Sequence, residues 1–322
     1  MSKGVSEIPP LAMELPERVI GEMSKTVVGK KGLMEDLLIA LMAEGHVVLE
    51  GVPGIAKTYV SKTFAHALGC RFRRIQFTPD ILPADVLGSY IFDQRKGQFK
   101  LRRGPIFSNV VLIDEINRGT PKTQSATLEV MQERQVTIEG KTHRLDRPFM
   151  VLSTVNPIET EGIYPLVTSQ VDRFMFKLNV DYPSGGEDLQ ILENLHAIEK
   201  SEVSQILDKE SILQLISCSE NVHVAPQIKD YIVNIISATR VNPALKYGGS
   251  PRAMIHLYKA SKARALTSKR NYVIPDDVKY VAPKVLNHRL ALTPETEAEG
   301  TQPKDIVEKI LSNVPIPKTE VA

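Results

Sequence analysis

Residues 51–58 read GVPGIAKT and fit the phosphate-binding pattern G-x-x-x-x-G-K-[ST] at every position except Ala56. In this pattern backbone N–H groups surround a phosphate, a lysine reaches the β- and γ-phosphates, and a hydroxyl holds Mg²⁺. Lys57 and Thr58 would fill the last two roles. Ala56 keeps its backbone N–H, and we expect right-handed backbone angles there, which suit alanine. The alternative is an ordinary strand–turn–helix connection that binds nothing. The candidate nucleotide-binding residues of the loop are Gly51, Val52, Pro53, Gly54, Ile55, Ala56, Lys57 and Thr58.

Two adjacent acids, Asp114 and Glu115, end the apolar segment NVVLIDE. Successive strand residues point to opposite faces, so the two carboxylates can take different tasks at the end of a strand. We expect Asp114 to bind Mg²⁺ beside Thr58, and Glu115 to orient and polarise an attacking water. The alternative is an exposed strand end that carries acids without a chemical role.

Three further polar residues could decide whether a bound nucleotide is hydrolysed. Asn156 ends the apolar run of LSTVNP, where it could position the water, although Asn-Pro also marks an ordinary turn. Arg173 could stabilise charge on a transferred phosphoryl group, or could form a surface ion pair with Asp172. Arg252 follows Ser250-Pro251, a typical helix start, where the helix dipole disfavours a cation unless an anion is bound. The alternative for Arg252 is a surface arginine whose charge reaches solvent.

The elements that must position these residues alternate between strands and helices. Short apolar strands are expected at 46–50, 109–114 and 149–154, and helices at 33–41 and 58–68. This alternation is typical of an α/β fold with a parallel sheet flanked by helices. Two hairpins are expected within 89–102 and 135–145. After the turn-rich segment at 183–186 the pattern becomes helical, with one more possible helix at 303–314.

Composition excludes several classes of protein. The chain has 322 residues, of which 42% are apolar and 24% are charged, as in a soluble globular protein. A net charge of +2 produces no strong attraction to nucleic acid or membrane. The longest apolar run, at 37–43, is far shorter than the ~20 residues of a transmembrane helix. Cys70 and Cys218 have no metal-ligand spacing, and with no secretion signal they indicate a cytoplasmic location.

Taken together, these motifs resemble the MoxR-type AAA+ ATPases over residues 27–292. The matching segments are VVGKKGL, LLIALMAEGHVVLEGVPGIAKT, RRIQFTPDILPADVLGSYIFD, GPIFSNVVLIDEINR, PKTQSATLEVMQERQVTIEGK, RPFMVLSTVNPIETEGIYPL, SQVDRF, GGSPRAMIHLYKASKARAL and NYVIPDDVKYVAPKVLNHRLAL. The resemblance implies a P-loop ATPase core at 21–182 and a small all-α lid domain at 183–292. A lead-in at 1–20 and a tail at 293–322 would flank them.

The same resemblance implies a role for each candidate residue. The loop at 51–58 becomes the Walker A motif, and Asp114 and Glu115 become the Walker B acids. Asn156 matches sensor 1, Arg252 matches sensor 2, and Arg173 matches a finger that acts on the neighbouring subunit. Departures from the family pattern are Ala56, Val155 before the sensor asparagine, and Thr168-Ser169 before the finger.

The family further implies ATP and Mg²⁺ as cofactors, a ring that is usually hexameric, and a chaperone-like action on client proteins. A partner with a von Willebrand factor A domain often accompanies such ATPases. Both hairpins would face the pore or a partner. Three other functions remain open: a nucleotide-dependent regulatory module with low turnover, a motor that works on nucleic acid, and a small-molecule kinase, which would act as a monomer and would not need Arg173 from a neighbour. The intact hydrolytic residues disfavour the first of these alternatives, and the near-neutral charge disfavours the second.

Overall fold

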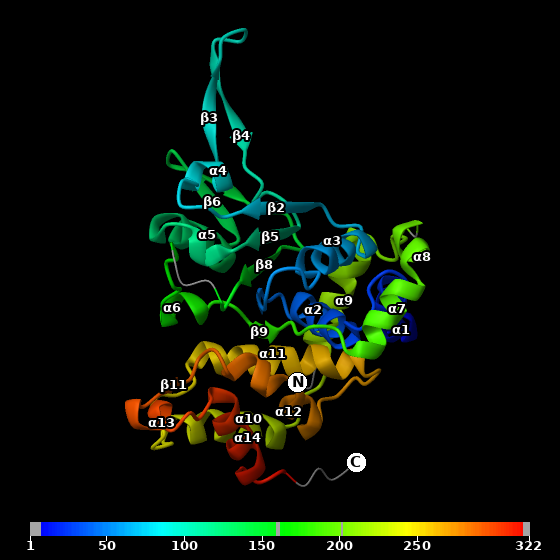
Figure 1. The fold of residues 1–322 in the computed structure, drawn as a ribbon, viewed down its shortest axis with the longest axis vertical. Helices are drawn as coiled ribbons and strands as arrows, with labels where there is room; N and C mark the ends of the chain where they lie inside the picture. Colours follow the sequence, from blue (N-terminus) through cyan, green and yellow to red (C-terminus); the bar gives the residue numbers. More distant parts are fainter. Residues whose placement is uncertain (1–7, 159–161, 201, 318–322) are drawn as a thin grey trace, which may run out of the picture.

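The computed structural model describes residues 8–158, 162–200 and 202–317, and its centre is a five-stranded parallel sheet (Figure 1). The strand order is β2-β5-β8-β1-β9, and adjacent strands are parallel throughout. The strands are β1 (Val47–Glu50), β2 (Phe72–Gln76), β5 (Val110–Asp114), β8 (Met150–Val155) and β9 (Phe176–Asn179). The predicted α/β fold and its three named strands are confirmed.

Apolar side chains cover both faces of this sheet. In β5, Val110 and Leu112 belong to one buried cluster, whereas Val111 and Ile113 belong to another. This division follows from the two-residue period of a strand and explains why the strand reads as a continuous apolar run. The helices of the core are α1 (Pro10–Met23), α2 (Lys31–Met42), α3 (Lys57–Ala67), α4 (Pro83–Leu87), η1 (Ile116–Arg118), α5 (Pro121–Glu133) and α6 (Thr168–Val171).

The edge strand β2 was not among the predicted strands. Its sequence FRRIQ buries only Ile75 and exposes two arginines and a glutamine. An edge strand has one paired side only, so it tolerates charged side chains and lacks the apolar run that marks β5. The N-terminal stretch predicted as a lead-in contains most of α1, which packs against α2 and α3.

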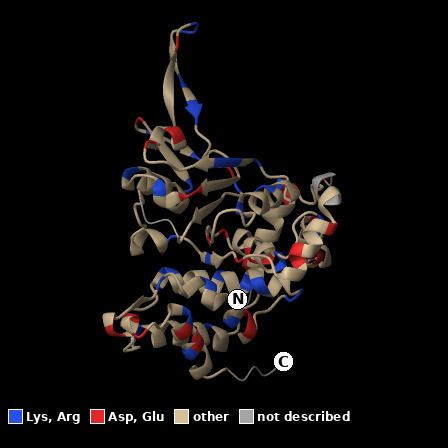
Figure 2. Ribbon diagram, in the orientation of Figure 1, with Lys and Arg blue, Asp and Glu red and all other residues tan. Residues whose placement is uncertain are grey.

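Both predicted hairpins are present. The first is β3 (Gly88–Asp93) with β4 (Gln98–Arg103), and the second is β6 (Gln135–Ile138) with β7 (Lys141–Arg144). The β3–β4 hairpin projects from the body of the protein and carries several Lys and Arg residues (Figures 1 and 2).

Helices dominate the chain after β9, as predicted. Helix α11 packs against α2, α9, α10 and α12, and α14 packs against α10 and α12. These elements are α7 (Gly185–Glu193), α8 (Leu195–Lys200), α9 (Lys209–Asn221), α10 (Pro226–Arg240), α11 (Pro251–Thr267), α12 (Pro275–Leu286), α13 (Pro294–Ala298) and α14 (Pro303–Asn313), with a small antiparallel pair of β10 (Leu245–Tyr247) and β11 (Ala291–Leu292). Across the described ranges, no helix is long and apolar enough to cross a bilayer.

Candidate nucleotide-binding site

The glycine loop connects the end of β1 to the start of α3, at the carboxyl edge of the sheet. Gly51 N–H donates to the carbonyl oxygen of Val155 at 3.2 Å, which fixes the start of the loop to β8. No side chain caps the N-terminus of α3, so its first N–H groups can receive an anion.

The expected backbone conformation of Ala56 is wrong. Ala56 has φ 64° and ψ 19°, which is left-handed, and Gly54 has φ 84°. Left-handed residues in such a loop turn successive N–H groups toward one concavity, where an anion can bind. The loop therefore keeps the geometry that glycine normally supplies, and alanine adopts it at a cost in backbone strain.

The sheet brings Thr58 and Asp114 together, although 55 residues separate them in the sequence. Thr58 Oγ1 lies 3.4 Å from Asp114 Oδ2. Thr154 Oγ1 donates to Asp114 Oδ1 at 2.5 Å, and Arg74 donates to Asp114 Oδ2 at 2.7 Å. Lys57 Nζ donates to the carbonyl oxygen of Gly51. A hydroxyl and a carboxylate side by side are the oxygen ligands that Mg²⁺ prefers, so these residues fit a magnesium–nucleotide site.

Metal binding by protein ligands alone is not indicated. Within the described residues there is no group of three or more His, Cys, Asp or Glu side chains that could hold a metal ion. A site with one carboxylate and one hydroxyl instead leaves coordination positions for phosphate oxygens and water, as is usual for Mg²⁺.

Glu115 lies beside the same edge and has an unusual backbone. Its φ of 57° is left-handed, and its N–H donates to Thr154 Oγ1 at 2.8 Å. The carboxylate accepts from Gln76 Nε2 at 2.8 Å and pairs with Arg118 at 3.2 Å. Strained non-glycine residues concentrate at functional sites, where the surrounding structure holds them in place.

Asn156 follows β8 directly, and β8 lies between β5 and β1 in the sheet. The strand order therefore places Asn156 between the acids and the glycine loop. The side chain is buried, and its Oδ1 accepts from Ile158 N–H at 3.2 Å. Sequence reasoning missed Arg74, Gln76 and Thr154, because the first two lie on the unpredicted strand β2 and the third lies within an apolar run.

A cavity of about 390 Å³ adjoins the glycine loop. Its walls combine Val27, Val28 and Ile55 with Tyr59 and Tyr182. A mostly apolar cavity with aromatic walls beside a phosphate-binding loop suits a nucleotide base. The sequence analysis named Ile55 as a loop residue, but no local pattern connected Val27, Val28 and Tyr182 to the loop, because they lie far from it in the sequence.

Arg173 and Arg252 lie together, but at the opposite edge of the sheet. They line one cavity of about 190 Å³ with Gly45, His46 and Met175. These last three residues precede β1 and β9, so the cavity lies at the amino edge. Strand β1 alone spans about 13 Å between this edge and the glycine loop. Within one chain, neither arginine lies beside the residues that follow the strands at the carboxyl edge.

An ion-pair network holds Asp172 beside these arginines. Arg252 Nη1 lies 2.9 Å and Arg289 Nε lies 2.8 Å from the Asp172 carboxylate, and Ser250 Oγ donates to it at 2.9 Å. Burial alone would raise the pKa of Asp172, but the bonds from Arg289 and Ser250 and the charge of Arg289 lower it below its usual value. Ser250 is the N-cap of α11, as predicted, and accepts from Ala253 N–H at 3.0 Å.

Comparison with known proteins agrees with this geometry. Residues 46–176 match the ATPase family associated with various cellular activities (AAA), and residues 237–310 match the AAA lid domain. The chain is 46% identical to the uncharacterized protein YeaC of Bacillus subtilis, over 93% of this chain and 94% of that protein. It is 43% identical to the chaperone MoxR1 of Mycobacterium tuberculosis, over 94% of this chain and 82% of that one. A solved structure of a presumed ATPase from Cytophaga hutchinsonii superposes with a TM-score of 0.90 at 43% identity, with 96% of each chain covered.

Proposed function

Because this chain belongs to the MoxR-type AAA+ ATPases, we propose that it hydrolyses ATP with Mg²⁺ in a ring of identical subunits and remodels a partner protein. The observation that carries the proposal is the convergence of Thr58 and Asp114 at the carboxyl edge of the sheet, with Glu115 and Asn156 beside them.

Each residue at this edge receives a proposed role. The N–H groups of the loop and Lys57 bind the phosphates, and the lysine leaves the Gly51 carbonyl to do so. Thr58 and Asp114 hold Mg²⁺, which when bound offsets the negative charge of the phosphates. Glu115 accepts a proton from the attacking water and orients it, and Asn156 donates a hydrogen bond at the same place.

The proposal of a ring is supported by the separation of the two edges. Arg173 and Arg252 lie at the amino edge of the sheet, away from the glycine loop of their own chain. We propose that both contact the nucleotide of a neighbouring subunit, where Arg173 acts as the finger and Arg252 as sensor 2. A head-to-tail contact that repeats closes into a ring when the rotation from one subunit to the next is a whole fraction of a turn, and a hexamer is the form we expect.

Other details of the proposal come from the family resemblance. The core at 21–182, the lid at 183–292 and the flanking segments remain proposed boundaries. A client protein, a partner with a von Willebrand factor A domain and a cytoplasmic location remain predictions as well. The partner is best tested by co-purification from the native source.

The test is ATPase activity against protein concentration for the wild type, Glu115→Gln and Arg173→Ala. Specific activity should rise with concentration, and each variant should lose about 10²-fold or more. Mixing the two variants should restore part of the turnover, because one interface then combines an intact Glu115 with an intact Arg173. Arg71→Ala, at an exposed arginine with 61% of its side chain accessible, is the matched control and should keep full activity.

Other outcomes would favour the alternatives. ATP binding without turnover at any concentration would indicate a regulatory module. Strong stimulation by DNA or RNA would indicate a nucleic-acid motor. Full activity that does not depend on concentration, and that survives Arg173→Ala, would refute the shared site.

A further inference from the structure

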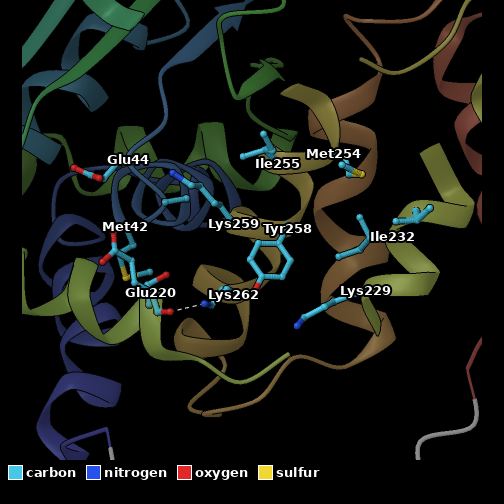
Figure 3. A pocket seen from close by; sticks show the side chains of 13 residues that line it. Met42, Glu44, Glu220, Lys229, Ile232, Met254, Ile255, Tyr258, Lys259 and Lys262 are labelled. Atoms are coloured by element: carbon cyan, nitrogen blue, oxygen red, sulfur yellow. Dashed lines mark hydrogen bonds between the residues drawn. The ribbon is translucent and has the colours of Figure 1, made fainter. Parts of the chain in front are cut away.

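An apolar groove with a basic rim lies where α2, α9, α10 and α11 meet. It has a volume of about 490 Å³, and its apolar wall includes Met42 of α2, Ile232 of α10, and Met254 and Tyr258 of α11 (Figure 3). Two further apolar side chains at the groove, Val233 and Ile255, are 46% and 50% exposed. Apolar surface of this kind marks a place where another molecule binds.

Three lysines border the groove: Lys229, Lys259 and Lys262 (Figure 3). The Lys262 ammonium donates to the carbonyl oxygen of Glu220 and lies 5.3 Å from the centre of the Tyr258 ring. Two acids, Glu44 and Glu220, also line the groove, so its three lysines outnumber the acids. Glu44, at one end of the groove, already pairs with Arg134 and Arg147 at 2.7 and 2.8 Å. The groove therefore suits an apolar segment that carries negative charge.

The position of the groove indicates which molecule supplies such a segment. Ala43, Glu44 and Lys259 line both this groove and the cavity that contains Arg173 and Arg252. The groove is thus continuous with the surface proposed above to meet the nucleotide of a neighbouring subunit.

Helix α7 has the complementary character. Leu189 and Leu192, three residues apart on one face, are 56% and 71% exposed. Asp188 and Glu193 are exposed on the same short helix, and acidic residues lie in the region of α7 in Figure 2. Asp188 and Ile191 line the cavity beside the glycine loop, so α7 lies directly next to the nucleotide-binding site of its own chain.

We propose that α7 of one subunit docks its leucines and acids into the apolar, lysine-bordered groove of the next subunit. This inference rests on the proposed shared site and identifies the surfaces that hold it together. When Arg173 and Arg252 of one subunit reach a neighbour's nucleotide, the groove beside them meets the α7 beside that nucleotide. Groove and helix lie on different parts of the chain, so the contact is heterologous and repeats around a ring.

Disulfide cross-linking between full-length variants tests the contact directly. Leu192→Cys and Ile255→Cys are purified separately and mixed with ATP and Mg²⁺ under oxidising conditions. Mass spectrometry then identifies the cross-linked peptides, which separates the engineered disulfide from products of Cys70 and Cys218. Leu11→Cys, at a leucine that is 58% exposed on α1, replaces Leu192→Cys in the control mixture.

The proposal expects a dimeric 192–255 cross-link in the mixture, about tenfold or more above the control, because docking of α7 in the groove places the two cysteines side by side. Leu192→Asp should weaken assembly by about tenfold or more, whereas Leu11→Asp should leave it unchanged. Glu193→Lys with Lys229→Glu tests the charges, and the double variant should assemble better than either single variant.

Two failures can be told apart. If Glu115→Gln and Arg173→Ala restore activity when mixed, but no 192–255 cross-link forms and Leu192→Asp assembles normally, the ring stands and this contact is wrong. If mixing restores nothing and the protein stays monomeric with ATP, the shared site itself is wrong, and the proposed contact is wrong with it.

Discussion

Ala56→Gly should stabilise the nucleotide-free protein. Ala56 is left-handed, with φ 64° and ψ 19°, and this conformation costs an L-residue about 1–2 kcal/mol that glycine does not lose. Glycine also raises the conformational entropy of the unfolded chain, which reduces the stabilisation by about 0.4–1 kcal/mol. Ala56 is exposed, so removal of its methyl group sacrifices little apolar contact. The net expected gain is roughly 1 kcal/mol.

Gly54→Ala provides the matched reverse experiment in the same loop. Gly54 has φ 84°, and a Cβ built on it would meet no atom within 4 Å. The destabilisation caused by Gly54→Ala is therefore backbone strain alone, and this variant should lose about as much stability as Ala56→Gly gains. A change of 1 kcal/mol should move Tm by about 1.5 °C in a chain of this size, in opposite directions for the two variants.

Urea unfolding and calorimetry of the nucleotide-free protein measure both changes. ATP affinity should stay within about threefold of wild type for Ala56→Gly, because the loop keeps the same conformation before and after binding. A lower Tm for Ala56→Gly would refute the argument, since it would mean that alanine is not strained in this loop or that its methyl group makes a contact that matters.

Two further predictions concern the carboxylate of Asp114 at the proposed magnesium site and the buried histidines. Arg74 pairs with the Asp114 carboxylate at 2.7 Å and so competes with Mg²⁺ for it, but the arginine is half exposed and the pair is therefore weak. In Arg74→Ala, half-maximal binding of a fluorescent ATP analogue should need about threefold less Mg²⁺. Acid should destabilise the fold steeply, because burial lowers the pKa of His46 to about 4, that of His256 to about 3, and that of His288 well below its usual value. These three histidines are neutral in the folded protein, whereas in the unfolded chain they bind protons below about pH 6.5. The free energy of unfolding should therefore fall as pH falls, by about 4 kcal/mol per pH unit near pH 5.

If Arg74→Ala leaves the Mg²⁺ concentration for half-maximal binding unchanged, Arg74 does not compete with Mg²⁺ for the Asp114 carboxylate. For the histidines, urea unfolding between pH 7 and pH 5 measures the slope, and His46→Gln should reduce the slope near pH 5 by about a third, since it removes one of the three histidines. A stability that stays level from pH 7 to pH 5 would contradict the buried, neutral state of these rings.

The motif residues at the carboxyl edge could be predicted because each belongs to a local pattern. A strand that ends in a glycine loop, a strand that ends in two acids, and a strand that ends in Asn-Pro are visible within ten residues each. Parallel strands share their carboxyl edge, so these three ends had to meet once the α/β fold was recognised. The local sequence was therefore enough to predict that Thr58, Asp114 and Asn156 would lie at the same edge of the sheet.

Only the tertiary structure decided the rest, because the deciding contacts lie between distant segments. Ala56 looks compatible with a helix start in sequence, but the loop closes between β1 and α3 and holds it left-handed. Arg74 and Gln76 reach the acids from an edge strand that has no apolar pattern. Arg173 and Arg252, 79 residues apart, meet at the amino edge of the sheet because α12 packs against β9 and α11 packs against α12. Sequence predicts the residue types that chemistry requires, whereas packing of the helices on the sheet sets which edge each of them reaches.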